Sequence, residues 1–96
     1  MRELTVEKHL INRVKEHGGF VRKIKWLNHR GAPDRLVGFP ATGEHYLVEL
    51  KAPGKKLEPH QRREIKKLQK IGFEVWILTA PILVENFLYQ ISKPKK

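Results

Sequence analysis

The sequence predicts an α/β domain in which a mixed sheet is flanked by helices, with the element order α-β-β-β-α-β-α. Apolar residues recur with helical spacing near the N-terminus, three short β-rich segments follow, and a second helical segment precedes a further β-rich one. A chain of 96 residues suits one domain, which we place at residues 1–92. Residues 93–96 then form a short basic tail.

The first helix is expected from about Thr5 to His17, with Thr5 as its N-cap and Gly18 as its stop signal. Its apolar face is formed by Val6, Leu10, Val14 and Ile11. Glu7 lies inside the same apolar arc. A carboxylate in that position must be paired, hold a metal, or reach solvent at the open end of the arc.

Three strands are expected next, over Phe20–Trp26, Asp34–Phe39 and His45–Lys51, with the turn 40–43 before the third. Because side chains alternate along a strand, Glu49 and Lys51 share one face of the third strand. If the second and third strands pair as a hairpin, Asp34 and Glu49 lie near the same end of it.

A second helix is expected from Pro59 to about Gly72, with Gln61 on its apolar face and basic residues on the opposite one. Residues 73–79 are nearly all apolar, which predicts a central strand covered on both sides. The segment from Pro81 to Ile91 is interpreted as a final helix, although its first residues would also suit a strand.

Charge and composition narrow the class of function. Twenty Lys and Arg residues against ten Asp and Glu give a net charge of +10, which favours a polyanionic partner. Nucleic acid is the first expectation, an anionic membrane surface competes with it, and a merely solubilising surface is the remaining alternative. The chain has no cysteine, so any metal would have oxygen or imidazole ligands. Without a signal-peptide pattern or a span-length apolar run, we expect a soluble cytoplasmic protein.

Two acids stand where a solvated surface would not place them. Glu49 lies within a β-rich run, where Glu is depleted, and Asp34 begins the preceding strand directly after Pro33. Two carboxylates that converge at a strand end form an oxygen site suited to Mg²⁺ or Mn²⁺. Lys51 beside them can orient or deprotonate a water and stabilise charge on a phosphate, as phosphodiester hydrolysis requires. The alternative is a solvated ion pair between Glu49 and Lys51.

These residues resemble a known nuclease signature. Pro33-Asp34, fourteen intervening residues and then Glu49-Leu50-Lys51 match the PD-(D/E)xK pattern. The segments Gly31–Asp34 and Val48–Gly54, with Gln61 on the next helix, resemble the VRR-NUC branch of that superfamily more specifically. The resemblance extends from Glu7 to about Thr79, and Ala32, where bulkier residues are common, is its one departure.

The resemblance implies a restriction-endonuclease-like core and a Mg²⁺- or Mn²⁺-dependent endonuclease that cuts branched DNA, such as four-way (Holliday) junctions, as a homodimer. The catalytic residues that it implies are Glu7, Asp34, Glu49, Lys51 and Gln61. Its three acids and the backbone carbonyl of Leu50 would bind the metal. Lys51 would position the nucleophilic water, and Gln61 would support the catalytic residues or contact the phosphate.

Basic residues near the expected site are candidates for DNA contacts. They are Lys23, Arg30, Arg35, Lys55, Lys56 and His60. A nucleic-acid-binding module that does not cut is the alternative function, and the charge of +10 and the basic second helix favour it. The intact acid set argues against it, because a protein that only binds has no use for carboxylates that repel phosphate.

Overall fold

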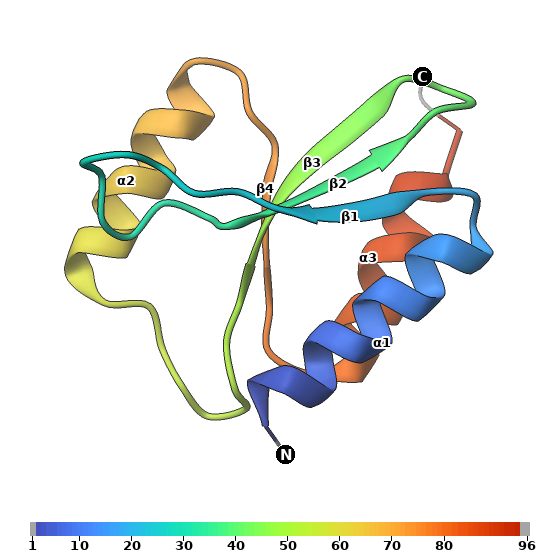
Figure 1. Cartoon of the computed structure of the whole chain (residues 1–96), viewed down its shortest axis with the longest axis horizontal. Helices are drawn as coiled ribbons and strands as arrows, with labels where there is room; N and C mark the ends of the chain where they lie inside the picture. Colours follow the sequence, from blue (N-terminus) through green and yellow to red (C-terminus); the bar gives the residue numbers. More distant parts are fainter. Residues whose placement is uncertain (1, 95–96) are drawn as a thin grey trace.

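A computed structural model describes residues 2–94 and shows a four-stranded sheet with helices on both sides (Figure 1). The elements in chain order are α1 (Glu3–Glu16), β1 (Phe20–Lys23), β2 (Arg35–Phe39), β3 (Glu44–Leu50), α2 (Pro59–Lys70), β4 (Val75–Leu78) and α3 (Pro81–Ser92). This is the predicted order, and the segment after Pro81 is a helix. No helix within residues 2–94 is long and apolar enough to cross a membrane. Of the predicted basic tail, Lys95 and Lys96 lie outside the described residues.

The sheet is mixed, with the strand order β1-β2-β3-β4. The pairs β1–β2 and β2–β3 are antiparallel, and β3–β4 is parallel. The prediction that residues 73–79 form a central strand is therefore wrong, since β4 lies at the edge of the sheet. Its apolar composition has another cause, because both α2 and α3 contact it.

The first two elements begin and end differently from the sequence-based boundaries. Helix α1 starts at Glu3 with Arg2 as its N-cap, so Thr5 lies inside the first turn and does not cap the helix. A carboxylate in the first turn interacts favourably with the positive end of the helix dipole, which supports the earlier start. Gly18 ends the helix as predicted, with a φ of 81°. Strand β1 stops at Lys23, three residues before the predicted end.

The main core lies between the sheet and the layer formed by α1 and α3, which pack side by side (Figure 1). Its most deeply buried members include Val6, Leu10, Val14, Val37, Val48, Val84 and Phe87. Burial of each large apolar side chain contributes about 1.5–3 kcal/mol. Helix α2 lies on the other side of the sheet, and its apolar face buries Ile65 and Leu68. This packing fixes the ends of β2 and β3, where the candidate site lies.

Candidate active site

The open end of the β2–β3 hairpin brings two acids together. Arg35 is paired with Val48 and Leu36 with Leu47, so the next residue pair along the ladder is Asp34 and Glu49. The backbone N–H of Ile24 also donates to the carbonyl of Asp34 at 2.8 Å, which holds this residue in line with β1. The hairpin inferred from the sequence is confirmed, and it places both carboxylates at one end of the sheet.

Glu49 is a buried carboxylate, with 8% of its surface exposed, on the side of the sheet that faces α2. Its Oε2 accepts a hydrogen bond from Nε2 of Gln61 at 3.2 Å. Burial, and after it the charge of Asp34, raises the pKa of Glu49 from 4.5 to about 7, while the charge of Lys51 opposes this shift. A carboxylate of this kind readily takes up either a proton or a cation at neutral pH.

Gln61 is positioned by the start of α2. Its Oε1 accepts a hydrogen bond from the backbone N–H of Glu58, the N-cap residue, at 2.8 Å. This bond is one half of a capping box, and it leaves the amide nitrogen free to donate to Glu49. Pro59 at the first helical position suits the same helix start. The helix cap thus orients the group that bonds the buried acid.

The loop that delivers Asp34 is fixed against α2 by a close approach at Gly31. Gly31 has a φ of 84°, and a Cβ there would lie 2.7 Å from the His60 ring and 3.1 Å from the Cα of Gln61. Only glycine fits this conformation and this space without displacement. The indole N–H of Trp26 donates to the carbonyl of Pro33 at 2.8 Å and ties the two arms of the loop together.

Glu7 lies on the other side of the sheet from Glu49 and contacts Arg35. Arg35 is on the same face of β2 as the buried Val37, and its Nε donates to Oε2 of Glu7 at 2.8 Å. Its Nη2 forms an ion pair with the same oxygen, and its Nη1 lies 2.7 Å from Oδ1 of Asp34. Burial disfavours the guanidinium charge, but the bonds to Glu7 and Asp34 outweigh it, so the pKa of Arg35 is raised.

Arg35 is predicted to contact a DNA phosphate, but its position in the structure does not suit that role. Only 9% of its surface is exposed, and its guanidinium is occupied by two carboxylates. Glu7 is predicted to bind the metal together with Asp34 and Glu49, and its position differs from that prediction as well. Within residues 2–94, no group of three or more His, Asp or Glu side chains is arranged to hold a metal ion. Glu7 and Asp34 are instead linked indirectly, because both carboxylates form ion pairs with the guanidinium of Arg35.

The oxygen donors at the hairpin end still fit a hard divalent cation. Asp34 and Glu49 supply two carboxylates, and the backbone carbonyl of Leu50 follows Glu49 directly in the chain. Mg²⁺ is commonly bound by one or two carboxylates, with water and substrate phosphate oxygens completing its coordination. Lys51 directly follows the last residue of β3, and its charge lowers the pKa of Glu49.

The remaining basic candidates other than His60 lie on the outside of the molecule. Lys23 lines a shallow groove that also includes Lys25, Trp26 and Asp34. Further side chains that the structure leaves exposed are Arg30, Lys55 and Lys56. His60 is half-buried beside Gly31.

Sequence reasoning missed Glu3 and the ion pairs of Arg35 at this end of the sheet. The charge of Glu3 acts on Glu49 and raises its pKa, and Glu3 precedes Glu7 by one helical turn. The spacing of these two acids places them on the same helix face, which is a signal that could have identified Glu3. The ion pairs of Arg35 had a similar signal, because strand alternation places Arg35 on the buried face of Val37.

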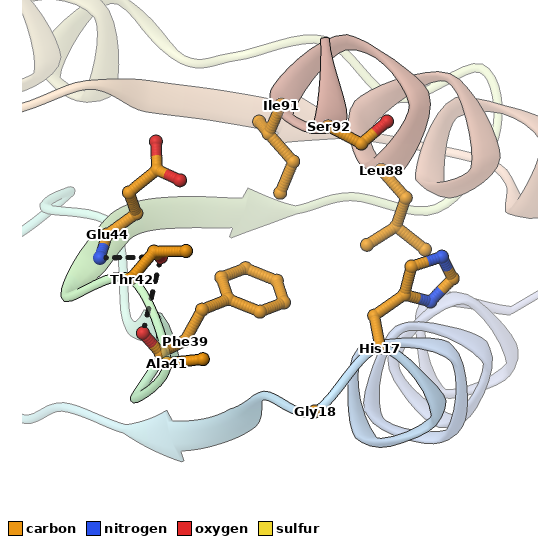
Figure 2. A pocket seen from close by; sticks show the side chains of 9 residues that line it. All are labelled: His17, Gly18, Phe39, Ala41, Thr42, Glu44, Leu88, Ile91 and Ser92. Atoms are coloured by element: carbon orange, nitrogen blue, oxygen red, sulfur yellow. Dashed lines mark hydrogen bonds between the residues drawn. The ribbon is translucent and has the colours of Figure 1, made fainter. Parts of the chain in front are cut away.

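A separate cavity of about 200 Å³ lies at the opposite end of the hairpin (Figure 2). Figure 2 shows Phe39, Leu88 and Ile91 around it, from β2 and α3, with the C-terminal end of α1 beside them. Its lining is mainly apolar, and of the acids only Glu44 belongs to it. The lining of this cavity therefore lacks the pair of carboxylates found at the open end of the β2–β3 hairpin.

Comparisons with known proteins agree with the fold. A family described as the VRR-NUC domain matches residues 8–81. Over 80 residues the chain is 44% identical to "Putative nuclease p44" of Acyrthosiphon pisum secondary endosymbiont phage 1, an alignment that covers 83% of this chain and 85% of that protein. A solved structure described as a VRR_NUC domain has a TM-score of 0.81 and 34% identity, with 91% of this chain and 94% of that chain covered. Because the family match spans most of the chain and both relatives share its length, this protein belongs to the VRR-NUC family of nuclease domains.

Proposed function

We propose that this protein is a metal-dependent endonuclease that hydrolyses phosphodiester bonds in branched DNA, such as four-way junctions. The observation that carries the proposal is the buried carboxylate of Glu49, which stands opposite Asp34 and is held by the side-chain amide of Gln61. Membership of the VRR-NUC family and the relative named as a nuclease support the reaction class.

In this proposal Asp34, Glu49 and the backbone carbonyl of Leu50 hold Mg²⁺ or Mn²⁺, and Glu7 joins the acid set through Arg35. A divalent cation bound there would polarise the scissile phosphate and lower the pKa of the attacking water. Two carboxylates leave room for substrate oxygens, so DNA itself would complete the site.

The other side chains position the reactants. The ammonium group of Lys51 would orient the attacking water and donate to a non-bridging phosphate oxygen, where it stabilises developing negative charge. Gln61 keeps the Glu49 carboxylate in one orientation because the helix cap fixes its amide. The exposed cations would hold the DNA backbone on either side: Lys23, Arg30, Lys55 and Lys56.

A homodimer would present two such sites to a two-fold symmetric junction, one from each subunit. We place the reaction in the cytoplasm of a bacterium or a phage-infected host. The net charge of +10 would draw the DNA to the protein and make binding dependent on salt.

The test is cleavage of labelled four-way junctions, flaps and plain duplex in Mg²⁺, Mn²⁺ or EDTA, with sedimentation analysis of the protein. We expect metal-dependent cleavage of the branched substrates and a mass of two chains. Asp34→Ala and Glu49→Ala should each lower the cleavage rate by about 100-fold or more. Glu16→Ala, at the far end of α1, is the matched control and should cut normally.

Two outcomes would contradict the proposal. Salt-dependent binding of DNA without cleavage in either metal would favour the non-cutting module suggested by the charge alone. Undiminished cleavage in both Asp34→Ala and Glu49→Ala would leave the enzyme class standing but remove these residues from the site.

A further inference from the structure

Among the described residues, Arg35 and Glu49 are the charged residues that are buried. They lie at the same end of the sheet on opposite faces, since Arg35 is aligned with Val37 toward α1 and Glu49 faces α2. A buried guanidinium is costly unless it is paired and hydrogen-bonded. Arg35 therefore depends on the groups around it, and these are acids of the proposed site.

Every nitrogen of the Arg35 guanidinium has an acidic residue as its partner. Nε and Nη2 contact Oε2 of Glu7, and Nη1 contacts both Oδ1 and the backbone carbonyl of Asp34, at 2.7 and 3.3 Å. The charge of Arg35 also lowers the pKa of Glu49 without touching it. One side chain thus acts on three carboxylates, and one of its contacts is to the Asp34 carboxylate, which would ligate the cation.

We propose that Arg35 is a resident counterion of the acid site, which competes with the divalent cation for Asp34 and so sets how tightly that cation binds. The inference rests on the proposed function for the location of the cation. Arginine cannot lose its charge in a protein, so this competition is present at every working pH. A cation site weakened in this way fills mainly when substrate phosphate adds its own oxygens.

The test is calorimetric titration of Mn²⁺ into metal-free protein without DNA. Removal of a unit charge in contact with Asp34 should tighten binding in Arg35→Met by about tenfold or more. Arg35→Lys keeps the charge but not the fork, so it should bind Mn²⁺ about as weakly as the unsubstituted protein. Arg13→Met is the matched control, because Arg13 also pairs with two acids, Glu16 and Glu85, but lies away from the site.

In Arg35→Met, thermal stability without metal should fall, whereas the affinity for Mn²⁺ should rise. In EDTA, Arg35→Met leaves Glu7 without its partner and should melt at a lower temperature than the unsubstituted protein. Its melting temperature should then rise more on addition of Mn²⁺. A residue with a merely structural role would lose stability and metal affinity together, so equal or weaker Mn²⁺ binding in a folded Arg35→Met would overturn the proposal.

A double variant and a parallel cleavage assay distinguish the remaining outcomes. If Arg35→Met does not fold in EDTA, the double variant Glu7→Gln with Arg35→Met removes both partners and should bind Mn²⁺ more tightly than Glu7→Gln alone. If the double variant does not bind Mn²⁺ more tightly than Glu7→Gln, the proposal fails. DNA cleavage by the unsubstituted protein, measured in parallel, reports on the nuclease function separately. Tighter Mn²⁺ binding without any cleavage would retain the counterion and reject the nuclease, and cleavage with unchanged affinities would do the reverse.

Discussion

When it is ionised, the buried carboxylate of Glu49 lowers the stability of the folded protein. In the unfolded chain its pKa has the ordinary value of 4.5, whereas burial first and then the charge of Asp34 raise it to about 7 in the folded protein. The folded state therefore binds this proton more tightly, and stability falls as the pH rises from about 4.5 through 7. A tenfold difference in proton affinity between the two states corresponds to about 1.4 kcal/mol, so the ionised acid costs a few kcal/mol above pH 7. Stability given up at one buried acid is typical of functional sites.

Glu49→Gln should therefore stabilise the metal-free protein. The amide keeps an acceptor for Gln61 and carries no charge, so we expect a gain of about 1–3 kcal/mol at pH 8, most of which disappears at pH 5. Urea unfolding of both proteins in EDTA at the two pH values measures this difference. A variant that gains nothing on going from pH 5 to pH 8 would contradict the role of burial at this acid.

Glu85 provides a control of opposite sign. Hydrogen bonds from Arg13 and His9 lower the pKa of Glu85 from 4.5 to about 2. This interaction stabilises the fold above pH 4.5, and the contribution is lost as the pH falls through 2. Glu85→Gln should therefore be less stable than the unsubstituted protein at pH 8, where Glu49→Gln is more stable.

At the scale of elements, local patterns in the sequence predicted the parts and non-local pairing decided their arrangement. The hairpin of β2 and β3 followed from alternation and a short turn, and it correctly placed Asp34 near Glu49. The edge position of β4 could not be predicted, because the partner of a parallel strand is set by a crossover and not by neighbouring residues. The contacts of Arg35 join two elements in the same non-local way.

The contact between the 24–34 loop and α2 provides a prediction at this scale. Gly31→Ala would place a methyl group within 2.7 Å of His60 at a φ of 84°, so the loop must move away from Gln61. We expect a loss of about 2–4 kcal/mol, from backbone strain and overpacking together, and a large loss of cleavage because Asp34 shifts with the loop.

The matched control for Gly31 is Gly43, in the turn at the other end of the hairpin. Gly43 has a φ of 76°, but a Cβ there meets no atom within 4 Å. Gly43→Ala should therefore cost only the backbone strain, about 1–2 kcal/mol, and leave cleavage unchanged. Equal stability losses in the two variants, or full cleavage by Gly31→Ala, would show that the loop is not fixed by this contact.

At the scale of the whole molecule, the candidate catalytic acids lie at one end of the sheet, while exposed lysines and arginines are spread over the outside. Lys55 and Lys56 lie exposed in the segment between β3 and α2, four and five residues after Lys51 in the chain. A distributed charge attracts DNA in general, whereas cations beside the site would also fix where the backbone lies. The two contributions can be separated by salt dependence.

The slope of log affinity against log salt counts the phosphates that the protein neutralises, at about 0.9 per phosphate on duplex DNA. If Lys55 and Lys56 each contact one phosphate, the double variant Lys55→Gln with Lys56→Gln should reduce that slope by about 1.8. Fluorescence anisotropy with labelled DNA in EDTA, between about 50 and 300 mM salt, measures it without cleavage. Lys8→Gln with Lys15→Gln removes the same charge from the exposed side of α1 and should leave the slope nearly unchanged. Equal reductions in the two variants would mean that overall charge, and not the position of these lysines between β3 and α2, governs how DNA is held.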